Sequence, residues 1–332
     1  TLCHGSWVEG LNRMDLNLVS SNHSKKVFED INFEKKDQQG KLLGHVKLEK
    51  PIEVIFEGID LKKFFPSKEN NSIDLSEIKE SFAYLFVGHW MQGDLGEDRK
   101  NVGLLIKSFY ENFKNKKKTP ALILKCSGAG ASYMDRDFIL GKIQQIRATV
   151  KANTLPNVYL LHGEFTDEEI NGLYNHSKVK AMLSLTKGEG FGRPLLEFSL
   201  VKKPILTTNW SGHIDFLDEK FTTLVGGEMK KVHPSAVVKD VLMGESEWFN
   251  ADLMEVGSHL HNMFTNYKQY TKGTMLQYHK SKNNFNFDKM CELIDKTLTQ
   301  YIPEFPKEVK LNLPKLKLPK LKLPKLELPK LK

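Results

Sequence analysis

The chain has 332 residues, of which 40% are hydrophobic and 27% are charged, and its formal net charge at pH 7 is +8. This composition is typical of an enzyme of about two domains. No run of residues reaches the roughly eighteen apolar residues of a membrane-spanning helix. The first residues do not predict a signal peptide. Three widely spaced cysteines without a C-x-x-C pair indicate neither a disulfide framework nor a structural zinc site, and they favour a cytoplasmic location.

The first clearly predicted elements lie between residues 82 and 113. The apolar run at 82–88 predicts a buried strand. Residues 99–101 then open a helix whose inward face carries Val102, Leu105, Ile106, Phe109 and Phe113. Positive charge at a helix start is locally unfavourable, so Arg99 and Lys100 indicate an anionic partner. The alternative is a solvated helix start.

Strands and helices alternate farther along the chain. Residues 121–126 and 157–161 are strand candidates. Thr166 and Glu169 form a capping-box pattern that starts a helix, with the inward positions Ile170, Leu173 and Tyr174. The alternation predicts parallel, right-handed β-α-β units and therefore an α/β fold.

The most informative segment runs from residue 181 to residue 197. A buried strand is predicted at 181–185, and it is followed by a glycine-rich loop and a new helix. In an open α/β sheet such a loop lies at the carboxyl edge of the strands, where free amides favour an anion such as a diphosphate. Glu189 and Glu197, eight residues apart (197 minus 189), would flank that anion and accept hydrogen bonds from sugar hydroxyls. The alternative is an ordinary turn with two surface glutamates.

This segment resembles a known family signature. It reads Gly188-Glu189-Gly190-Phe191-Gly192-Arg193-Pro194-Leu195-Leu196-Glu197, which is similar to the E-x7-E motif of the retaining GT-B glycosyltransferases of group 1, family 4. Residues 203–212 look like the strand and loop that follow in that family, and Lys100 matches its phosphate-clamp lysine. His89 stands where the clamp has an arginine, and a neutral histidine is a weaker phosphate partner. Arg99, beside Lys100, can compensate.

The resemblance, which runs from about residue 13 to residue 302, implies a domain organisation of the GT-B type. A complete Rossmann-like, nucleotide-sugar-binding domain is expected at 81–284. A linker at 67–80 precedes it, and residues 1–66 are expected to be the tail of an incomplete N-terminal, acceptor-side Rossmann-like domain. A helix at 285–303 should return toward that first domain, which we expect to need a half that this chain lacks. We therefore expect the chain to be a fragment of a longer protein.

The function that the resemblance implies is transfer of a sugar from a nucleoside diphosphate to an acceptor hydroxyl, with retention of configuration. It gives catalytic roles to Glu189 and Lys100, with Glu189 holding donor-sugar hydroxyls. Donor-binding roles fall to His89, Arg99, Gly190, Phe191, Gly192, Arg193 and Glu197, the last on the ribose. No metal and no cofactor is expected. The expected partners are the nucleotide sugar and a hydroxyl of a glycan, a lipid or a protein.

Two other classes of function stay open. His89 and the incomplete first half are compatible with a degenerate relative that binds a nucleotide sugar without transferring it. In that case, or without the missing half, the fragment alone would be inactive. A different enzyme on the same fold, such as a sugar epimerase or a phosphorylase, is the other alternative.

The positive charge of the chain belongs to its last residues. From 311 to 332 there are seven lysines and one acid, Glu327, so this segment carries 7 − 1 = +6 and leaves about +2 for the rest. No nucleic-acid partner is therefore expected. The segment at 304–332 repeats Leu-Pro-Lys-Leu-Lys, and a proline every fifth residue forbids a helix, so a disordered tail is predicted. Contact with an anionic membrane surface or a partner protein is the alternative, which would make the protein peripheral at the membrane.

Overall fold

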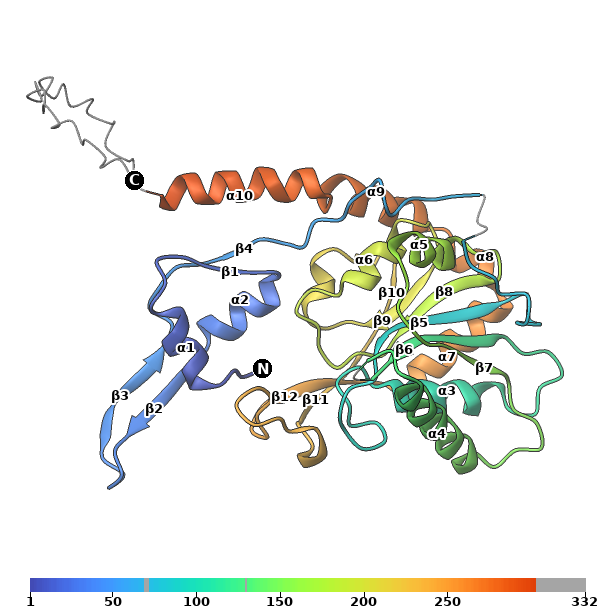
Figure 1. The fold of residues 1–332 in the computed structure, drawn as a ribbon, viewed down its shortest axis with the longest axis horizontal. Helices are drawn as coiled ribbons and strands as arrows, with labels where there is room; N and C mark the ends of the chain where they lie inside the picture. Colours follow the sequence, from blue (N-terminus) through green and yellow to red (C-terminus); the bar gives the residue numbers. More distant parts are fainter. Residues whose placement is uncertain (69–71, 129, 303–332) are drawn as a thin grey trace, which may run out of the picture.

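The computed structural model describes residues 1–68, 72–128 and 130–302. The predicted repeat tail lies outside the described residues. Figure 1 shows a small N-terminal unit at one side and a larger α/β unit at the other, and the segment after β4 and the helix α10 run between them. In the described part of the chain, no helix has the length and apolar character needed to cross a membrane.

A six-stranded parallel sheet forms the centre of the larger unit. Its strands, in the order β10-β9-β8-β5-β6-β7, are Thr223–Val225, Ile205–Thr208, Val179–Ser184, Ala83–His89, Ala121–Ser127 and Val158–Leu161. The chain winds from β5 outward through β6 and β7, and from β8 outward through β9 and β10. The strand order therefore reverses between β5 and β8, which is the point where open α/β sheets bind ligands.

Helices cover both faces of this sheet, as Figure 1 shows. One face packs on α3 (Val102–Phe113), α4 (Tyr133–Thr149) and α7 (Leu253–Thr265), and the other packs on α5 (Asp167–Asn175) and α6 (Arg193–Ser199). The short α8 (Tyr267–Tyr270) and α9 (Thr274–Asn284) follow α7. Alternate residues of β5 serve the two faces: Tyr84 and Phe86 belong to one core, and Ala83 and Leu85 to the other.

The predicted strands and helices of this unit are confirmed. The inward residues predicted for α3 are all fully buried: Val102, Leu105, Ile106, Phe109 and Phe113. The capping box is present, because Thr166 accepts a hydrogen bond from the Glu169 amide while the Glu169 carboxylate accepts one from the Thr166 amide. Local patterns were sufficient here because both features depend on residues close together in the sequence.

The N-terminal unit is small and has its own core, made by Cys3, Val8 and Ile31. Its elements are α1 (Gly5–Leu11), β1 (Asn17–Val19), α2 (Asn22–Glu29), β2 (Asn32–Lys36), β3 (Leu42–Lys47) and β4 (Ile52–Val54). Strands β1 and β4 pair in parallel, while β2 and β3 form an antiparallel hairpin that the sequence analysis did not predict.

The packing does not divide at residue 66. Ile59 and Phe64, placed in the first domain by the sequence, are buried in the core beneath α5 and α6 together with Leu75 and Ile78. Helix α10 (Phe287–Tyr301) does return toward the first unit, and it starts beside Ile59, which is bridged to Asn286. Its end is held by the Tyr301 hydroxyl, which lies 2.8 Å from a Glu53 carboxylate oxygen. Helix α10 therefore reaches the N-terminal unit at Glu53.

A second unpredicted feature is an arm, residues 227–251, inserted between β10 and α7. It consists of β11 (Gly227–Lys231), the short 3-10 helix η2 (Pro234–Ala236) and β12 (Glu247–Ala251), and the two strands pair antiparallel to each other apart from the main sheet. Trp248 is buried within the arm against Val232 and Ala236. The arm is tied to the glycine-rich loop by a hydrogen bond from the Phe249 amide to the Lys187 carbonyl.

Candidate functional site

The glycine-rich loop leaves the carboxyl end of β8, at the reversal of the strand order, and enters α6. Gly192 at the start of α6 has φ +98°, a conformation that favours glycine, and a Cβ there would lie 3.0 Å from the Cβ of His213. The glycine-rich loop packs even more closely against the loop that precedes η1. A Cβ on Gly212, the first residue of the 3-10 helix η1 (Gly212–Asp215), would lie 2.2 Å from the Gly190 carbonyl oxygen. These two glycines let the two loops touch.

Hydrogen bonds hold the first half of this loop. The Glu189 amide donates to the Ser211 hydroxyl at 2.8 Å, and the Gly212 amide donates to the Glu189 carbonyl at 3.0 Å. The Gly188 amide donates to the Thr186 hydroxyl at 3.4 Å. The next four amides, at 190–193, donate to no atom among the described residues. They are the part of the loop that can still bind an anion, as predicted for Gly190, Phe191, Gly192 and Arg193.

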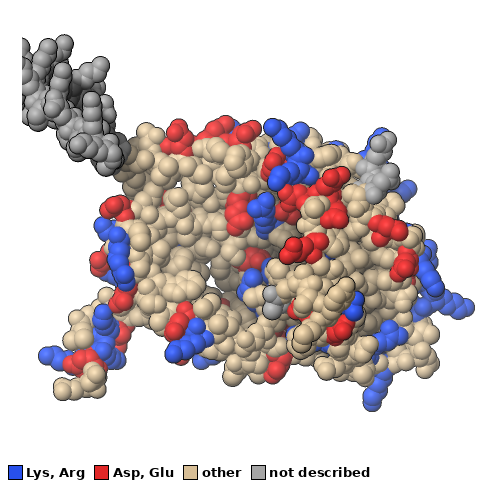
Figure 2. Space-filling view, viewed as in Figure 1, with Lys and Arg blue, Asp and Glu red and all other residues tan. Residues whose placement is uncertain are grey.

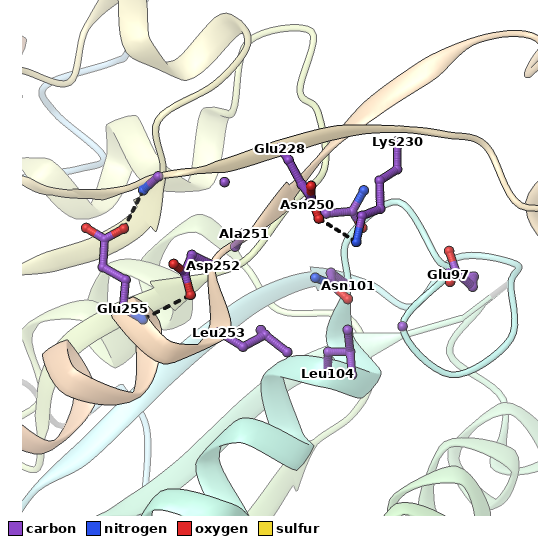
Figure 3. A pocket seen from close by; sticks show the side chains of 13 residues that line it. Glu97, Asn101, Leu104, Glu228, Lys230, Asn250, Ala251, Asp252, Leu253 and Glu255 are labelled. Carbon is purple, nitrogen blue, oxygen red and sulfur yellow. Dashed lines mark hydrogen bonds and ion pairs between the residues drawn. The ribbon is translucent and has the colours of Figure 1, made fainter.

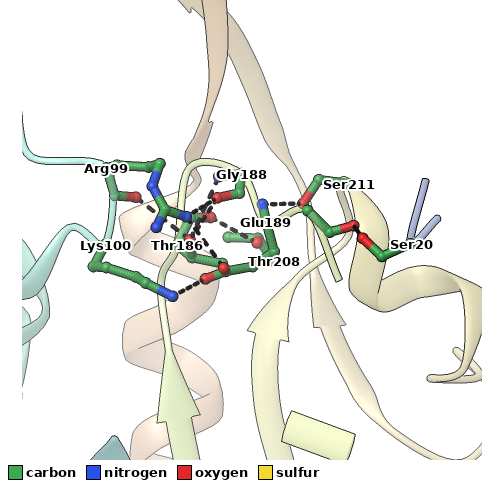
Figure 4. Close-up of polar contacts among 9 residues, drawn as sticks. Ser20, Arg99, Lys100, Thr186, Gly188, Glu189, Thr208 and Ser211 are labelled. Carbon is green, nitrogen blue, oxygen red and sulfur yellow. Dashed lines mark hydrogen bonds and ion pairs between the residues drawn. The ribbon is translucent and has the colours of Figure 1, made fainter. Parts of the chain in front are cut away.

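The side chain of Glu189 joins two cations, as Figure 4 shows. Its Oε1 lies 2.5 Å from the Lys100 Nζ, and its Oε2 lies 3.1 Å from the Arg99 Nη1, which also donates to the Gly188 carbonyl at 2.6 Å. Burial raises the pKa of Glu189, but the charges of Lys100 and Arg99 outweigh burial and hold this pKa below its usual value. The cluster therefore contains two cations and one anion, a net charge of +1, which leaves it attractive to a phosphate.

His89 lies at the end of β5 and is exposed to solvent. Its Nδ1 is 3.0 Å from the hydroxyl of Ser127, at the end of the neighbouring strand β6. The stem of Lys100 passes over the same strand end, because a Cβ on Gly88 would lie 3.9 Å from the Lys100 Cε. The sheet thus brings His89, Lys100 and Glu189 to one edge.

Glu197 is placed differently from Glu189. Its side chain is only 10% exposed, and both carboxylate oxygens already have partners: the Tyr174 hydroxyl at 2.9 Å and the Arg193 Nε at 3.0 Å. Burial raises the pKa of Glu197, and the hydrogen bond from Tyr174 and the charge of Arg193 offset this only in part. To bind a ribose, Glu197 would have to exchange one of these contacts. The Arg193 side chain remains half exposed.

The side chain of Phe191 lies in the core, away from the loop surface. The ring is 2% exposed and packs against Phe216, with ring centroids 5.0 Å apart, inside the core beneath α6. A ligand can therefore meet only the backbone of this residue. The reason is geometric: Gly190 and Gly192 give the loop its close turn, and the residue between them points into the core.

A cavity of about 460 Å³ opens beside this cluster, and Glu189 forms part of its wall. The N-terminal unit contributes Trp7 and Phe28 to its lining, and the arm contributes Leu242 and Trp248. Trp210, in the loop between β9 and η1, also lines it. Figure 2 shows the hollow between the two units, with acidic and basic side chains along it. A much smaller space of about 10 Å³ lies on the other side of Glu189, against Lys100 and Gly192. Neither cavity is lined by Glu197.

The sequence analysis missed several residues of this site. Ser211 and Gly212 lie in the segment 203–212 that resembles the family, and Lys187 directly precedes the loop. No sequence pattern connected these three residues with Glu189. The Lys187 ammonium is buried, lies 3.3 Å from a Glu97 carboxylate oxygen and sits 4.7 Å from the centre of the Trp248 ring. A lysine directly before the motif was the one available signal.

A larger cavity, of about 590 Å³, lies apart from the cluster, between the start of α3 and the base of the arm (Figure 3). Its acidic side chains already have partners: Glu228 pairs with Lys230, and Glu255 accepts a hydrogen bond from the Gly226 amide. Within the described residues, no group of three or more His, Cys, Asp or Glu side chains is arranged to hold a metal ion.

Part of the chain is similar to a known family of proteins. Residues 90–234 match the family model described as Glycosyl transferases group 1. Similar solved structures are sucrose-phosphate synthase from Thermosynechococcus elongatus, a glycosyltransferase from Rickettsia africae ESF-5, and Anabaena HepE in complex with UDP and glucose. They share 14%, 14% and 15% sequence identity with this chain, at TM-scores of 0.59, 0.58 and 0.58.

The matches cover 89% of this chain in all three cases, but the chain spans only 60%, 67% and 66% of the three proteins. At these identities the likeness establishes the fold, which is the GT-B fold expected from the sequence. No curated protein matches the chain at a significant level.

Proposed function

We propose that the protein, whose residues 90–234 match the model of the group 1 glycosyltransferases, transfers a sugar from a nucleoside diphosphate to an acceptor hydroxyl with retention of configuration. The observation that carries this proposal is the contact of Glu189 with both Lys100 and Arg99, at the reversal of the strand order and inside the matched segment. Relatives of this fold include proteins described in complex with UDP, UDP-glucose or UDP and GlcNAc. A nucleotide sugar is therefore the donor class we assign.

The cations and the anion of the cluster would have different tasks in this reaction. The bond between the anomeric carbon and the diphosphate breaks as the acceptor oxygen bonds to that carbon. The departing diphosphate carries the electron pair, and one of its oxygens accepts the proton of the acceptor hydroxyl. Lys100, Arg99 and the amides at 190–193 would stabilise that negative charge, an electrostatic effect of typically ~3 kcal/mol per donor. His89 would add a further contact to the phosphates.

Glu189 has the complementary task. Because its pKa is held low, it is an acceptor-only carboxylate at neutral pH and can orient hydroxyl groups of the donor sugar. Phosphate binding would draw Lys100 and Arg99 partly away from Glu189 and so free its oxygens for those hydroxyls. Glu197 would hold the ribose after exchanging its contact with Arg193, whose side chain is half exposed. Neither glutamate is assigned as a nucleophile, and the reaction is proposed to need no metal.

Calorimetry with UDP-, GDP- and ADP-glucose, followed by NMR of the product formed with a mixture of acceptors, tests the proposal. We expect one nucleotide class to bind, and we expect the product to keep the donor's anomeric configuration in the presence of EDTA. Absence of binding by every nucleotide sugar would refute the assignment. Binding without any product would instead identify a relative that has lost transfer, and a requirement for orthophosphate would identify a phosphorylase.

A further inference from the structure

The cavity of about 460 Å³ beside Glu189 is lined by both charged and aromatic side chains. The charged residues include Arg99 and Glu189 of the proposed donor site. The aromatic residues include three of the four tryptophans of the chain, Trp7, Trp210 and Trp248. The volume lies in the range of ~300–1,000 Å³ that is usual for small-molecule sites, and such sites combine apolar walls with a few polar groups.

Trp210 stands between the two units of the molecule. Its ring is stacked on Phe249 of the arm, with centroids 6.0 Å apart and planes at 11°. The ring of His23, on α2, meets it nearly edge-on at 5.2 Å. One face of the indole is thus covered by Phe249, while the ring still lines the cavity. An aromatic ring fixed in this way presents a flat surface of low entropy cost to a ligand.

The other tryptophans frame the same space. Trp7, on α1, is 44% exposed. Trp248 is almost fully buried, and its indole Nε1 has no hydrogen-bond partner among the described residues. Polar residues line the same cavity as these rings, namely Ser24, Ser246 and Glu247. The site therefore offers aromatic faces and hydrogen-bonding groups together.

We propose that this cavity is the acceptor subsite and that the acceptor is a sugar, one of whose rings stacks on Trp210 while a hydroxyl points toward Glu189. The proposal rests on the proposed function and narrows its acceptor. The C–H face of a pyranose carries slight positive charge and complements the negative face of an indole. Its hydroxyls satisfy the polar groups of the wall. An alkyl chain could form no additional hydrogen bond with Ser24, Ser246 or Glu247, which line the cavity.

The arm forms part of the wall of this proposed acceptor subsite. Phe249 stacks on Trp210, and Trp248 lies next to the Lys187 ammonium. The arm also contacts the N-terminal unit, where the Leu2 amide donates to the Ser246 hydroxyl at 3.0 Å. The subsite is therefore built from residues that are far apart in the sequence.

Tryptophan fluorescence of the full chain offers a direct test, because three of the four tryptophans line the cavity. Titration with maltose, cellobiose and lactose should give a saturable change for at least one disaccharide. Trp90→Phe, which removes the one tryptophan outside the cavity lining, should keep that change. Trp210→Ala should raise the apparent Kd at least tenfold, and Trp210→Phe should raise it less. Tyr133→Ala, which removes an exposed aromatic ring on α4, is the matched control and should not alter it.

Donor binding is measured on the same variants by calorimetry with UDP-, GDP- and ADP-glucose. If wild type binds no nucleotide sugar, the proposed function fails. If it binds a nucleotide sugar but shows no saturable response to a disaccharide, the acceptor proposal fails alone. A saturable response to decyl phosphate or to a serine-containing peptide, with none to the sugars, would likewise overturn it. In steady-state assays, Trp210→Ala should raise the acceptor KM at least tenfold, whereas the control Tyr133→Ala should leave both KM and kcat unchanged.

Discussion

The Lys100 ammonium lies 2.5 Å from the Oε1 of Glu189, so the predicted phosphate-binding lysine and the predicted sugar-binding glutamate form one ion pair. Their side chains are only 13% and 10% exposed. Because this ion pair is shielded from water, it links the proposed phosphate-binding part of the donor site electrostatically to the proposed sugar-binding part. Any phosphate that approaches Lys100 changes the surroundings of Glu189 as well.

Lys100→Met should therefore impair both stability and activity. Removing one partner of a buried pair typically costs about 3–5 kcal/mol, reduced here because Arg99 still neutralises Glu189. We expect kcat to fall about a hundredfold, which corresponds to ~3 kcal/mol of lost stabilisation of the leaving group. Urea unfolding and steady-state kinetics measure the two effects.

The matched control for this prediction is Lys114→Met, because Lys114 pairs with Glu111 at 2.5 Å at a far more exposed position. Exposed pairs are worth at most about 1 kcal/mol, and kcat should not change. Equal stability losses in the two variants would show that the Lys100 pair is not shielded as described.

Variants at Glu197 and Tyr174 distinguish the structural role of Glu197 from its proposed role in binding the donor. Glu197→Ala should cost about 1–3 kcal/mol of stability, because it leaves the Tyr174 hydroxyl buried without its partner, and it should also weaken nucleotide-sugar binding at least tenfold. Tyr174→Phe removes the same hydrogen bond but leaves the carboxylate in place. It should lower stability by about 1 kcal/mol and leave donor affinity nearly unchanged. If both variants bind the donor like wild type in calorimetry, Glu197 has no role on the ribose.

Gly212→Ala should disturb the site without touching a charged residue. The new methyl group would lie 2.2 Å from the Gly190 carbonyl oxygen, so the two loops must separate and Glu189 must move with them. We expect lower thermal stability and a loss of transfer activity of at least tenfold. Gly141→Ala is the control: nothing lies within 4 Å of a Cβ there, and alanine in the interior of a helix should stabilise by about 0.5–1 kcal/mol. A Gly212→Ala variant with wild-type kinetics would contradict the close packing.

Lys203 should make stability rise with pH above neutrality. Burial lowers the pKa of Lys203 to about 7, and its ammonium donates to the carbonyls of Tyr174 and His176. In the unfolded chain this lysine keeps its usual pKa of 10.5, so between pH 7 and 10 the unfolded state binds more protons than the folded state. The contribution to the free energy of unfolding then increases by up to ~1.4 kcal/mol per pH unit.

Lys203→Met removes this titration. The difference in urea-unfolding free energy between wild type and variant should therefore change in favour of wild type as the pH rises from 7 to 10. Contributions from other lysines and from tyrosines cancel in that difference. Parallel pH profiles of the two proteins would rule out a lowered pKa at Lys203.

Much of the larger unit could be predicted from the sequence. The apolar runs that became β5, β6 and β8, the inward face of α3 and the capping box at Thr166 are local patterns, set by residues within a few positions of one another. The segment from Gly188 to Glu197 also carried the resemblance to the group 1 glycosyltransferases, because strand, loop and helix start follow one another directly. Those features depend on backbone geometry and side-chain periodicity, which the order of residues specifies by itself.

Only the tertiary structure determined which of the predicted residues lie in contact with one another. Glu189 and Glu197 look equivalent in the sequence, yet Glu189 lies against Lys100 and a cavity, while Glu197 is buried under Tyr174 and Arg193. The arm, the stacking of Trp210 on Phe249 and the docking of α10 at Glu53 likewise join residues far apart in the chain. Such contacts depend on how complete elements pack against each other. No short window of sequence contains both partners, so only the folded chain could reveal them.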